Sequence, residues 1–335
     1  MWKKIVIGVV VLAVIALAVF KIFFPTSTAK KSMEKALEDC TSYHMEGNMD
    51  LEIQEETRHF FVTTDYLKEG DDDYFKVSLL DKGISQEQII VKNKSGVYVL
   101  TPSLNAVYHF EGDWPLNSPK PYLYQSMLEL AKGKHELTKV EGGYLLKANI
   151  ADETHPEWKV ETVRFDKEWK PSLVTIESEE KETLARLTFT EVQMNVETKA
   201  EDFSVENIMK QARENLTSVT SFTQEDLPFY PTNAPVSATL KEEKEVTWSN
   251  SKKTMLVYEG VQEFTVVQSL VEPYKELTYQ ETTGKLLEVG GTFAIYEDNC
   301  LLYQYANVQY EIYSNTLTVA ELSSIVVGME NVVIK

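Results

Sequence analysis

Residues 96–110 have the sequence GVYVLTPSLNAVYHF and carry the clearest local pattern in this chain of 335 residues. The two ends of the segment, 96–101 and 106–110, are rich in valine and aromatic residues, which suit the half-buried surface of a strand. Between them lies Pro-Ser-Leu-Asn, and both proline and asparagine are typical turn residues. The segment therefore predicts two strands joined by a turn.

A helix is predicted after these two strands and an aromatic corner, Asp113-Trp-Pro-Leu-Asn117. Ser118 suits the N-cap, Pro119 suits the first helical position, and Gly133 suits the end of the helix. The helix over 119–132 would bury one apolar face. That face consists of Tyr122, Met127, Leu128 and Ala131.

Strand patterns continue on both sides of this region. Met45, Met49, Leu51 and Ile53 alternate with polar residues, which is the period of a half-buried strand. Similar patterns occur at 59–65, 74–80, 88–91, 145–150, 158–165, 171–178 and 183–196. Strands this close together, with one helix inserted, predict a single antiparallel sheet that curls around apolar material.

A second β-rich part is predicted after a helix over 205–216, where apolar residues recur at helical spacing. The proline-rich stretch 227–235 that follows is a poor core segment. Further strand patterns lie at 237–246, 255–258, 263–269, 292–296, 301–305 and 308–312. Thr318 and Glu321 form a capping-box pattern, which predicts a last helix that runs to about residue 329.

The N-terminus predicts a membrane anchor. Residues 5–20 are all apolar, and 5–24 contain Lys21 as their one charge, so the run is long enough to cross a bilayer. A cleaved signal peptide is the alternative, because Ser27-Thr28-Ala29 suits a small-residue cleavage site. Both interpretations place the bulk of the chain outside the cytoplasm. With the anchor retained, we expect a single-pass protein of the cell membrane.

The sequence therefore predicts three parts. They are a transmembrane anchor over 1–25, a curved-sheet domain over 26–216, and a smaller α+β domain over 217–335. A short polar helix over 29–39 would lead from the membrane into the first domain.

The composition excludes some partners. The chain has 52 Asp and Glu against 33 Lys and Arg, a net charge of −19. The electric field of this net negative charge disfavours binding to nucleic acid and to anionic membrane surfaces. The two cysteines, Cys40 and Cys300, are far apart in sequence, so a disulfide is possible outside the cell but a small disulfide-stapled scaffold is excluded.

The sequence contains no recognisable catalytic or metal centre, and we expect no enzyme and no cofactor. The five histidines, at 44, 59, 109, 135 and 155, have none of the spacings of zinc sites. A glycine-rich phosphate loop and a Gly-x-Ser-x-Gly elbow are both absent. Asp71, Asp72 and Asp73 lack the ligand spacing of an EF-hand, and an acidic turn explains them better.

The text from Gly96 to Gln125 resembles the LolA/RseB-like superfamily of lipoprotein-carrier folds. Within this superfamily, the motifs VYVLTP and DWPLN most resemble the sequences of the clostridial GerS-like, germination lipoprotein-related proteins. The likeness covers roughly 30–200. Residues 217–335 are similar to the small β-rich domain of membrane-anchored regulators. The chain departs from GerS-like lipoproteins in having no cysteine just after the apolar run.

The resemblance implies an α+β fold, in which a curved antiparallel half-barrel, covered by helices, presents an apolar concave face. Such a face could bind an acyl chain or an apolar segment of a partner, since burying each CH₂ group contributes about 0.8 kcal/mol. The candidate lining residues, which would otherwise simply be core, are Val97, Val99, Val107, Tyr122, Met127 and Leu145.

The expected function is a non-enzymatic, membrane-tethered accessory protein. It would bind a protein partner or a lipid or acyl group in cell-envelope or spore-wall processes, including germination. An RseB-like regulator of a membrane signalling protein is the alternative. An enzyme with an unfamiliar site is a third hypothesis, which requires a cleft of carboxylates with raised pKa values.

Overall fold

The computed structural model describes residues 25–53, 56–110, 120–216, 219–248 and 251–330. The predicted anchor over 5–24 and the predicted cap residues Ser118 and Pro119 lie outside these ranges. Within them, every helix is too short or too polar to cross a bilayer.

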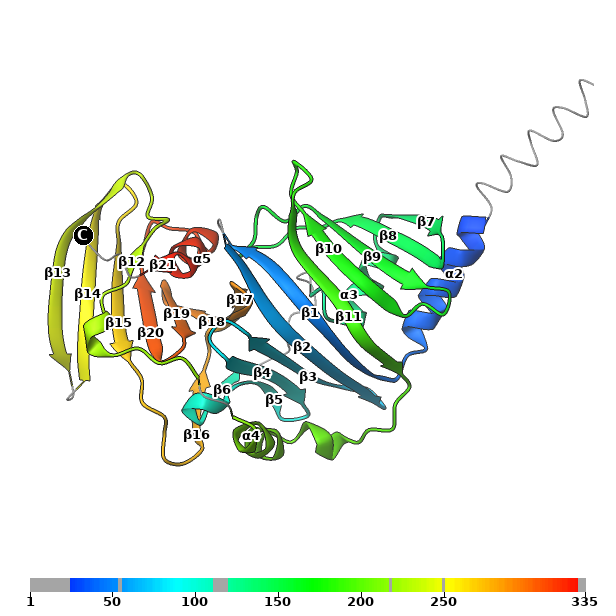
Figure 1. Cartoon of the computed structure of the whole chain (residues 1–335), viewed down its shortest axis with the longest axis horizontal. Coiled ribbons are helices and arrows are strands. Elements are labelled where there is room, and N and C mark those ends of the chain that lie inside the picture. Colours follow the sequence, from blue (N-terminus) through cyan, green and yellow to red (C-terminus); the bar gives the residue numbers. More distant parts are fainter. Residues whose placement is uncertain (1–24, 54–55, 111–119, 217–218, 249–250, 331–335) are drawn as a thin grey trace, which may run out of the picture.

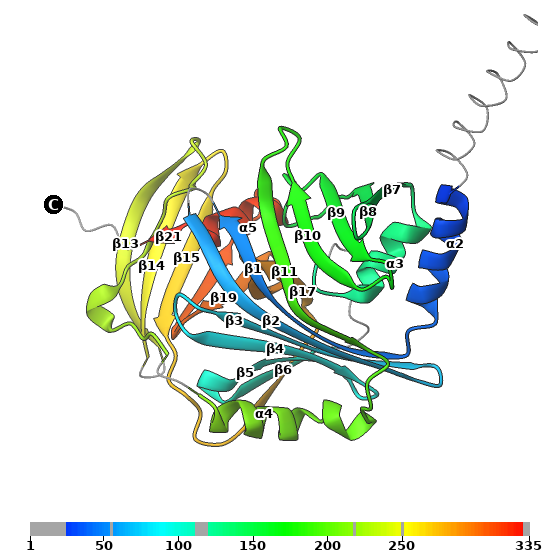
Figure 2. The same ribbon diagram turned by 45° about the vertical axis from the view of Figure 1, so that its right-hand side comes forward.

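Twelve of the described strands form one strongly curved sheet (Figures 1 and 2). Neighbouring strands are antiparallel except for the outermost pair, β16 and β6, which is parallel. In spatial order the strands are β16 (Thr278–Thr282), β6 (Ala106–Phe110), β5 (Gly96–Thr101), β4 (Gln86–Asn93), β3 (Asp72–Asp81), β2 (Glu56–Glu69), β1 (Ser42–Ile53), β11 (Thr183–Met194), β10 (Pro171–Glu177), β9 (Val160–Asp166), β8 (Gly143–Asn149) and β7 (His135–Val140). The predicted curved antiparallel sheet is confirmed, and β7 and β16 are additions to it.

The burial of β4 explains the apolar run Ile89-Ile90-Val91 in its middle. Ile90 belongs to the core on the concave face of the sheet, while Ile89 and Val91 belong to a second core on the convex face. A strand that is covered on both faces reads as an unbroken apolar run. In β1, by contrast, Met45, Met49 and Leu51 are buried and their neighbours are polar, as the alternation predicts.

Helices cover both faces of this sheet. On the concave side α2 (Pro25–Glu38) and α3 (Tyr124–Lys132) lie side by side, and on the convex side α4 (Val205–Glu214) packs over β4 and β5 (Figure 2). Helix α3 is shorter than predicted, because Leu123 N–H bonds the Lys120 carbonyl in a turn before the helix begins. Short 3₁₀ turns span η1 (Pro102–Leu104), η2 (Ala200–Phe203) and η3 (Gln224–Asp226).

Seven of the remaining described strands form a second antiparallel sheet. Its described strands, in spatial order, are β13 (Ala238–Trp248), β14 (Ser251–Gly260), β15 (Phe264–Leu270), β20 (Val308–Tyr313), β19 (Cys300–Tyr305), β18 (Thr292–Glu297) and β17 (Lys285–Val289). Helix α5 (Val319–Val327) packs on one face, beside the short pair β12 (Tyr230–Pro231) and β21 (Met329–Glu330). The predicted capping box of α5 is confirmed, since Glu321 N–H donates to Thr318 Oγ1 and Thr318 N–H donates to Glu321 Oε2.

The second sheet supplies part of the first core. Phe293 is 6% exposed and belongs to the apolar cluster on the concave face, with Leu286 and Ile295 packed against it. Gln86 exchanges two hydrogen bonds with the backbone of Ala306, at 2.9 and 3.2 Å. These contacts hold the two sheets together as one packed unit.

A strand from the C-terminal part also extends the first sheet. β16 pairs in parallel with β6, and the chain that leads into it is fixed by Tyr274 N–H to Leu104 O and Thr278 N–H to Asn105 O. Residues on both sides of the predicted boundary at 217 therefore share a sheet and a core. The division into domains 26–216 and 217–335 stays a prediction.

Removal of Lys120 should destabilise the junction between the two sheets. Lys120 Nζ lies 3.0 Å from Glu288 Oε2, and the two side chains are 7% and 10% exposed. Lys120→Ala would leave a buried carboxylate without its cation, so we expect a loss of about 3–5 kcal/mol in the free energy of unfolding, measured with urea. The matched control is Lys285→Ala, which removes an exposed ion pair with Glu153 and should cost less than about 1 kcal/mol. Equal losses would contradict a structural role for the buried pair.

Glu161 should make stability fall as the pH rises. It is fully buried on β9, both carboxylate oxygens lack a hydrogen-bond partner, and burial raises its pKa to about 8. Between its unfolded and folded pKa values, unfolding releases a proton, so each pH unit costs about 1.4 kcal/mol. Glu161→Gln should remove this slope in urea unfolding curves recorded from pH 5 to pH 8. The same slope in both proteins would contradict the account.

Candidate functional site

The structure brings four of the six predicted lining residues together. Val97, Val99, Tyr122 and Met127 belong to the core on the concave face and are 0–4% exposed. Tyr122 is further fixed by its hydroxyl, which donates to Glu288 Oε2 at 2.7 Å. These side chains are packed against neighbours, and a ligand role for them stays a prediction.

The shared face predicted for the other two residues is wrong. Val107 pairs with Leu100, and both lie in the convex-side core under α4. Leu145 is half-buried, whereas its neighbour Leu146 is fully buried on the concave side. Both errors follow from the two-residue period of a strand, because the sequence shows the alternation but does not state which phase faces inward.

Aromatic side chains of the first sheet fill part of its concave face. The Tyr43 and Tyr66 rings stack with centroids 5.2 Å apart, and Phe75 packs against Tyr66 at 4.9 Å. Val99 borders a void of about 20 Å³ where Phe293 of the second sheet packs in, which is room for a single water.

A larger cleft of about 420 Å³ opens between the two sheets. Helix α5, which lines the cleft, lies beside the end of β1 (Figure 1). The first sheet contributes the ends of β1 and β11 and the loop before β9, and the second contributes the end of β17, residue 233 and α5. The lining residues are Glu52, Ile53, Thr154, His155, Pro156, Glu157, Leu184, Asn233, Val289, Gly290, Ala320, Glu321, Ser323, Ser324 and Val327.

Local structure holds the rim of this cleft in place. Asp152 Oδ1 accepts the N–H groups of Thr154 and His155 at 2.8 and 2.9 Å, which shapes the loop before β9. The His155 ring stacks on Trp158 with centroids 4.3 Å apart. Opposite this loop, Gly290 has a positive φ of +60°, and a Cβ there would lie 2.7 Å from Val327 Cγ1. Glycine therefore permits the close packing of this turn against α5.

The cleft combines apolar walls with negative charge. Burial disfavours the charged form of Glu157, but the interactions with His155 and a backbone hydrogen bond together outweigh it and lower the pKa of Glu157. The backbone and side chain of Thr318 lower the pKa of Glu321. Ile53, Leu184 and Val327 supply apolar surface between these carboxylates. The arrangement suits a ligand with an apolar side chain and a positive charge.

Ser323, in the wall of the cleft, has a side-chain hydroxyl without a hydrogen-bond partner in the described structure. The residue is 3% exposed. Buried hydroxyl groups are normally paired, and leaving one unpaired costs about 1–3 kcal/mol.

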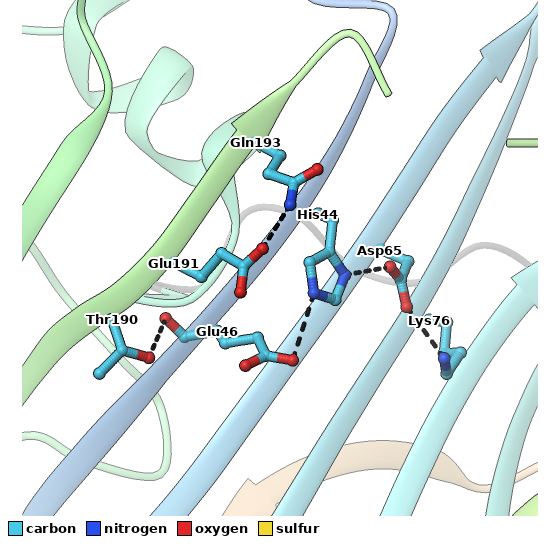
Figure 3. A network of polar contacts seen from close by, with 7 residues as sticks. All are labelled: His44, Glu46, Asp65, Lys76, Thr190, Glu191 and Gln193. Atoms are coloured by element: carbon cyan, nitrogen blue, oxygen red, sulfur yellow. Dashed lines mark hydrogen bonds and ion pairs between the residues drawn. The ribbon is translucent and has the colours of Figure 1, made fainter. Parts of the chain in front are cut away.

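A polar network lies on the convex face, across β1, β2 and β3 (Figure 3). His44 Nδ1 lies 2.7 Å from Asp65 Oδ1, and Lys76 Nζ lies 2.9 Å from Asp65 Oδ2. His44 Nε2 lies 3.3 Å from Glu46 Oε1. The network borders a polar cavity of about 370 Å³ beneath the segment that leads into α4.

Both ring nitrogens of His44 face carboxylates, which favours the charged imidazolium. The hydrogen bond to Asp65 is the main cause of the raised pKa of His44, and partial burial opposes it. Burial raises the pKa of Asp65, but His44 and Lys76 outweigh this and lower it. An imidazolium that donates through both nitrogens has no lone pair for general base catalysis.

The described residues form no metal site, and the two cysteines are not activated for nucleophilic chemistry. In the described part of the chain, no group of three or more His, Cys, Asp and Glu could hold a metal ion. Cys40 and Cys300 are free thiols, and burial raises the pKa of each to about 11. Neither is a thiolate at neutral pH, which is the form that nucleophilic catalysis requires.

Asp65 should control the protonation of His44. Asp65→Asn removes the main cause of the raised pKa, so the pKa of His44 should fall in an NMR titration of its ring protons. The stability that protonation supplies is present below the unfolded pKa and is lost as the pH rises through the folded pKa. The control is Glu191→Gln, because Glu191 bonds Gln193 rather than His44. An unchanged pKa in Asp65→Asn would contradict the network.

No family model matches the chain. It is similar to "Sporulation protein YdcC" of Bacillus subtilis, with 23% identity over 301 residues, 89% of this chain and 88% of that protein. Among solved structures, it is similar to the Pseudomonas aeruginosa MucA/MucB complex, with 14% identity, a TM-score of 0.31, and coverage of 88% of this chain and 95% of that chain.

A second similar structure is a putative outer membrane lipoprotein-sorting protein domain from Vibrio parahaemolyticus. The identity is 13% and the TM-score 0.33, over 55% of this chain and 99% of that chain. TM-scores of this size carry no argument about fold or function. Membership of the LolA/RseB-like superfamily, the finer likeness to GerS-like proteins and the regulator-type C-terminal domain therefore stay predictions.

Proposed function

We propose that this chain is a non-enzymatic binding protein, held at the outer face of the cell membrane by residues 5–24, which engages a protein partner during spore formation or a related cell-envelope process. The observation that carries the proposal is the cleft of about 420 Å³ between the two sheets, with the buried and unpartnered hydroxyl of Ser323 in its wall. Volumes of this size are typical of sites that bind a ligand.

The chemistry of the cleft supports a partner segment with an apolar side chain next to a lysine or arginine. Glu52, Glu157 and Glu321 offer carboxylates, and Ile53 and Leu184 offer apolar contacts. A cation on the partner would be attracted to these carboxylates. Because salt screens this attraction, the partner should bind more weakly as salt is added. The name of the Bacillus subtilis relative supports a role in sporulation.

An acyl chain is less well supported as a ligand. It would need open space on the concave face, where Val97, Val99, Tyr122 and Met127 are packed against neighbours. Native mass spectrometry of the chain purified from membranes distinguishes a protein partner from an acyl ligand. A bound acyl species would favour a role as a lipid carrier.

Crosslinking from inside the cleft tests the proposal. A photoreactive p-benzoylphenylalanine in place of Ala320, which lines the cleft, should capture a protein in cells that are forming spores. The same residue in place of Val236, which is fully exposed, serves as the control. Capture from 320 but not from 236 supports the proposal, and equal capture from both contradicts it. A membrane signalling protein as the captured species would favour the RseB-like regulator, and a wall-modifying enzyme the accessory role.

The captured partner should depend on the apolar wall of the cleft. Leu184→Glu places a charge among carboxylates and removes apolar contact, so we expect the yield of crosslinked partner to fall about tenfold, which corresponds to about 1.4 kcal/mol. Leu240→Glu, at a site on β13 that is 42% exposed, should leave the yield unchanged. Urea unfolding of both variants checks that the fold is intact. An unchanged yield in a folded Leu184→Glu variant would place the partner elsewhere.

A further inference from the structure

Helix α2 is fixed to the body of the protein. Met33 and Leu37 are 0% and 4% exposed in the concave-side core. Trp169 Nε1 donates to Ser32 Oγ at 3.1 Å, which ties the middle of the helix to the turn between β9 and β10. In the sequence, Pro25 at the start of α2 directly follows the apolar run 5–24. The direction in which the chain enters the body is therefore set by α2.

The end of α3 lies at the same end of the molecule as the start of α2. Tyr43, just after α2, donates its hydroxyl to Gln125 in the first turn of α3 at 2.6 Å. Because the two helices lie side by side, this contact makes them antiparallel. Figure 2 shows α2 beside α3 and β7, with the first turn of α2 at its upper end. Lys132 and Lys134 therefore lie near the first turns of α2.

Lysines gather at this end of an otherwise acidic molecule. We define the lysine pole as Lys30 and Lys31 on α2 together with Lys132 at the end of α3 and Lys134 just beyond it. Lys30 and Lys132 lie 3.9 and 3.5 Å from carboxylates of their own helices. Among the described residues, the exposed Lys31 and Lys134 form no ion pair. The chain as a whole carries a net charge of −19, so this excess of positive charge is local.

The pole lies within electrostatic reach of a membrane surface. At about 1.5 Å per residue, Lys31 is about 9 Å along α2 from Pro25, close to the Debye length of about 8 Å at physiological salt. Each lysine this close to an anionic surface strengthens association about fivefold. The acidic remainder of the molecule is repelled by the same surface.

We infer that the lysine pole binds anionic phospholipid headgroups, and so holds the molecule in one orientation on the membrane. This inference rests on the membrane anchoring proposed above. In this orientation α2 is the membrane-proximal element, and the second sheet, at the opposite end of the molecule in Figure 1, faces away from the bilayer.

Lysine acetylation of the full chain in nanodiscs tests the inference. Discs of phosphatidylcholine alone are compared with discs that also contain phosphatidylglycerol, and mass spectrometry follows each lysine. We expect Lys31 and Lys134 to react several-fold more slowly in the anionic discs, with the difference lost at high salt. Lys241 and Lys252, exposed on β13 and β14, should react equally in both.

Variants separate the pole from a general effect of charge. In Lys31→Gln/Lys134→Gln, the remaining Lys30 and Lys132 should lose their protection by anionic lipid. The matched variant Lys241→Gln/Lys252→Gln should keep it. Equal acetylation of the pole in both kinds of disc would overturn the inference and leave the anchor standing. A full chain that enters neither kind of disc would overturn both.

Discussion

The apolar concave face of a curved sheet has to be shielded from water, and in this chain residues of the second sheet help to shield it. Phe293 enters the core of the first sheet from β18, and Leu286 and Ile295 pack beside it. The polar groups at this contact are paired, since Gln88 Oε1 accepts the N–H of Phe293 at 2.9 Å. Because the cover is a strand pair of the second sheet, the position of that sheet follows from the packing of the first.

This constraint also determines where a partner has room to bind. The two sheets meet along β17 and β18 and diverge beside α5, and the divergence leaves the cleft. Arg58 reinforces the junction near the cleft, with its guanidinium carbon 4.8 Å from the centre of the Tyr305 ring. The cleft is therefore bounded by walls that are held apart by packing. Little ordering of the protein itself would then be needed on binding, which favours affinity.

The sequence predicted most of the strands in which burial leaves a pattern, but it missed β17 (KLLEV), although Leu287 and Val289 are buried there. β5 and β6 were predicted to the residue, because both strands are apolar and a Pro-Asn turn separates them. β16 (TYQET) and β7 (HELTKV) were missed, because edge strands carry mixed polar residues that resemble a loop. The parallel pairing of β16 with β6 joins residues about 170 positions apart. The local sequence of either strand does not predict such a contact.

The candidate site was less predictable than the fold. Val97 and Val99 were placed on the correct face, but Val107 was not, because β6 is apolar on both sides. The cleft was not predicted at all. Its walls come from Glu52, Leu184 and Ser323, which are ordinary residues in their own segments and meet through the packing of the two sheets. The unpartnered hydroxyl of Ser323 is visible only once its surroundings are known.

The central claim is that the two sheets form one unit, and residue-resolved hydrogen exchange of the full chain tests it most directly. The N–H groups of Phe293 and Ala306 donate to Gln88 and Gln86 across the junction. The account predicts that both amides exchange as slowly as that of Val266, in the middle of the second sheet. If the two junction amides exchange orders of magnitude faster than Val266, the sheets separate in solution, and the account is wrong.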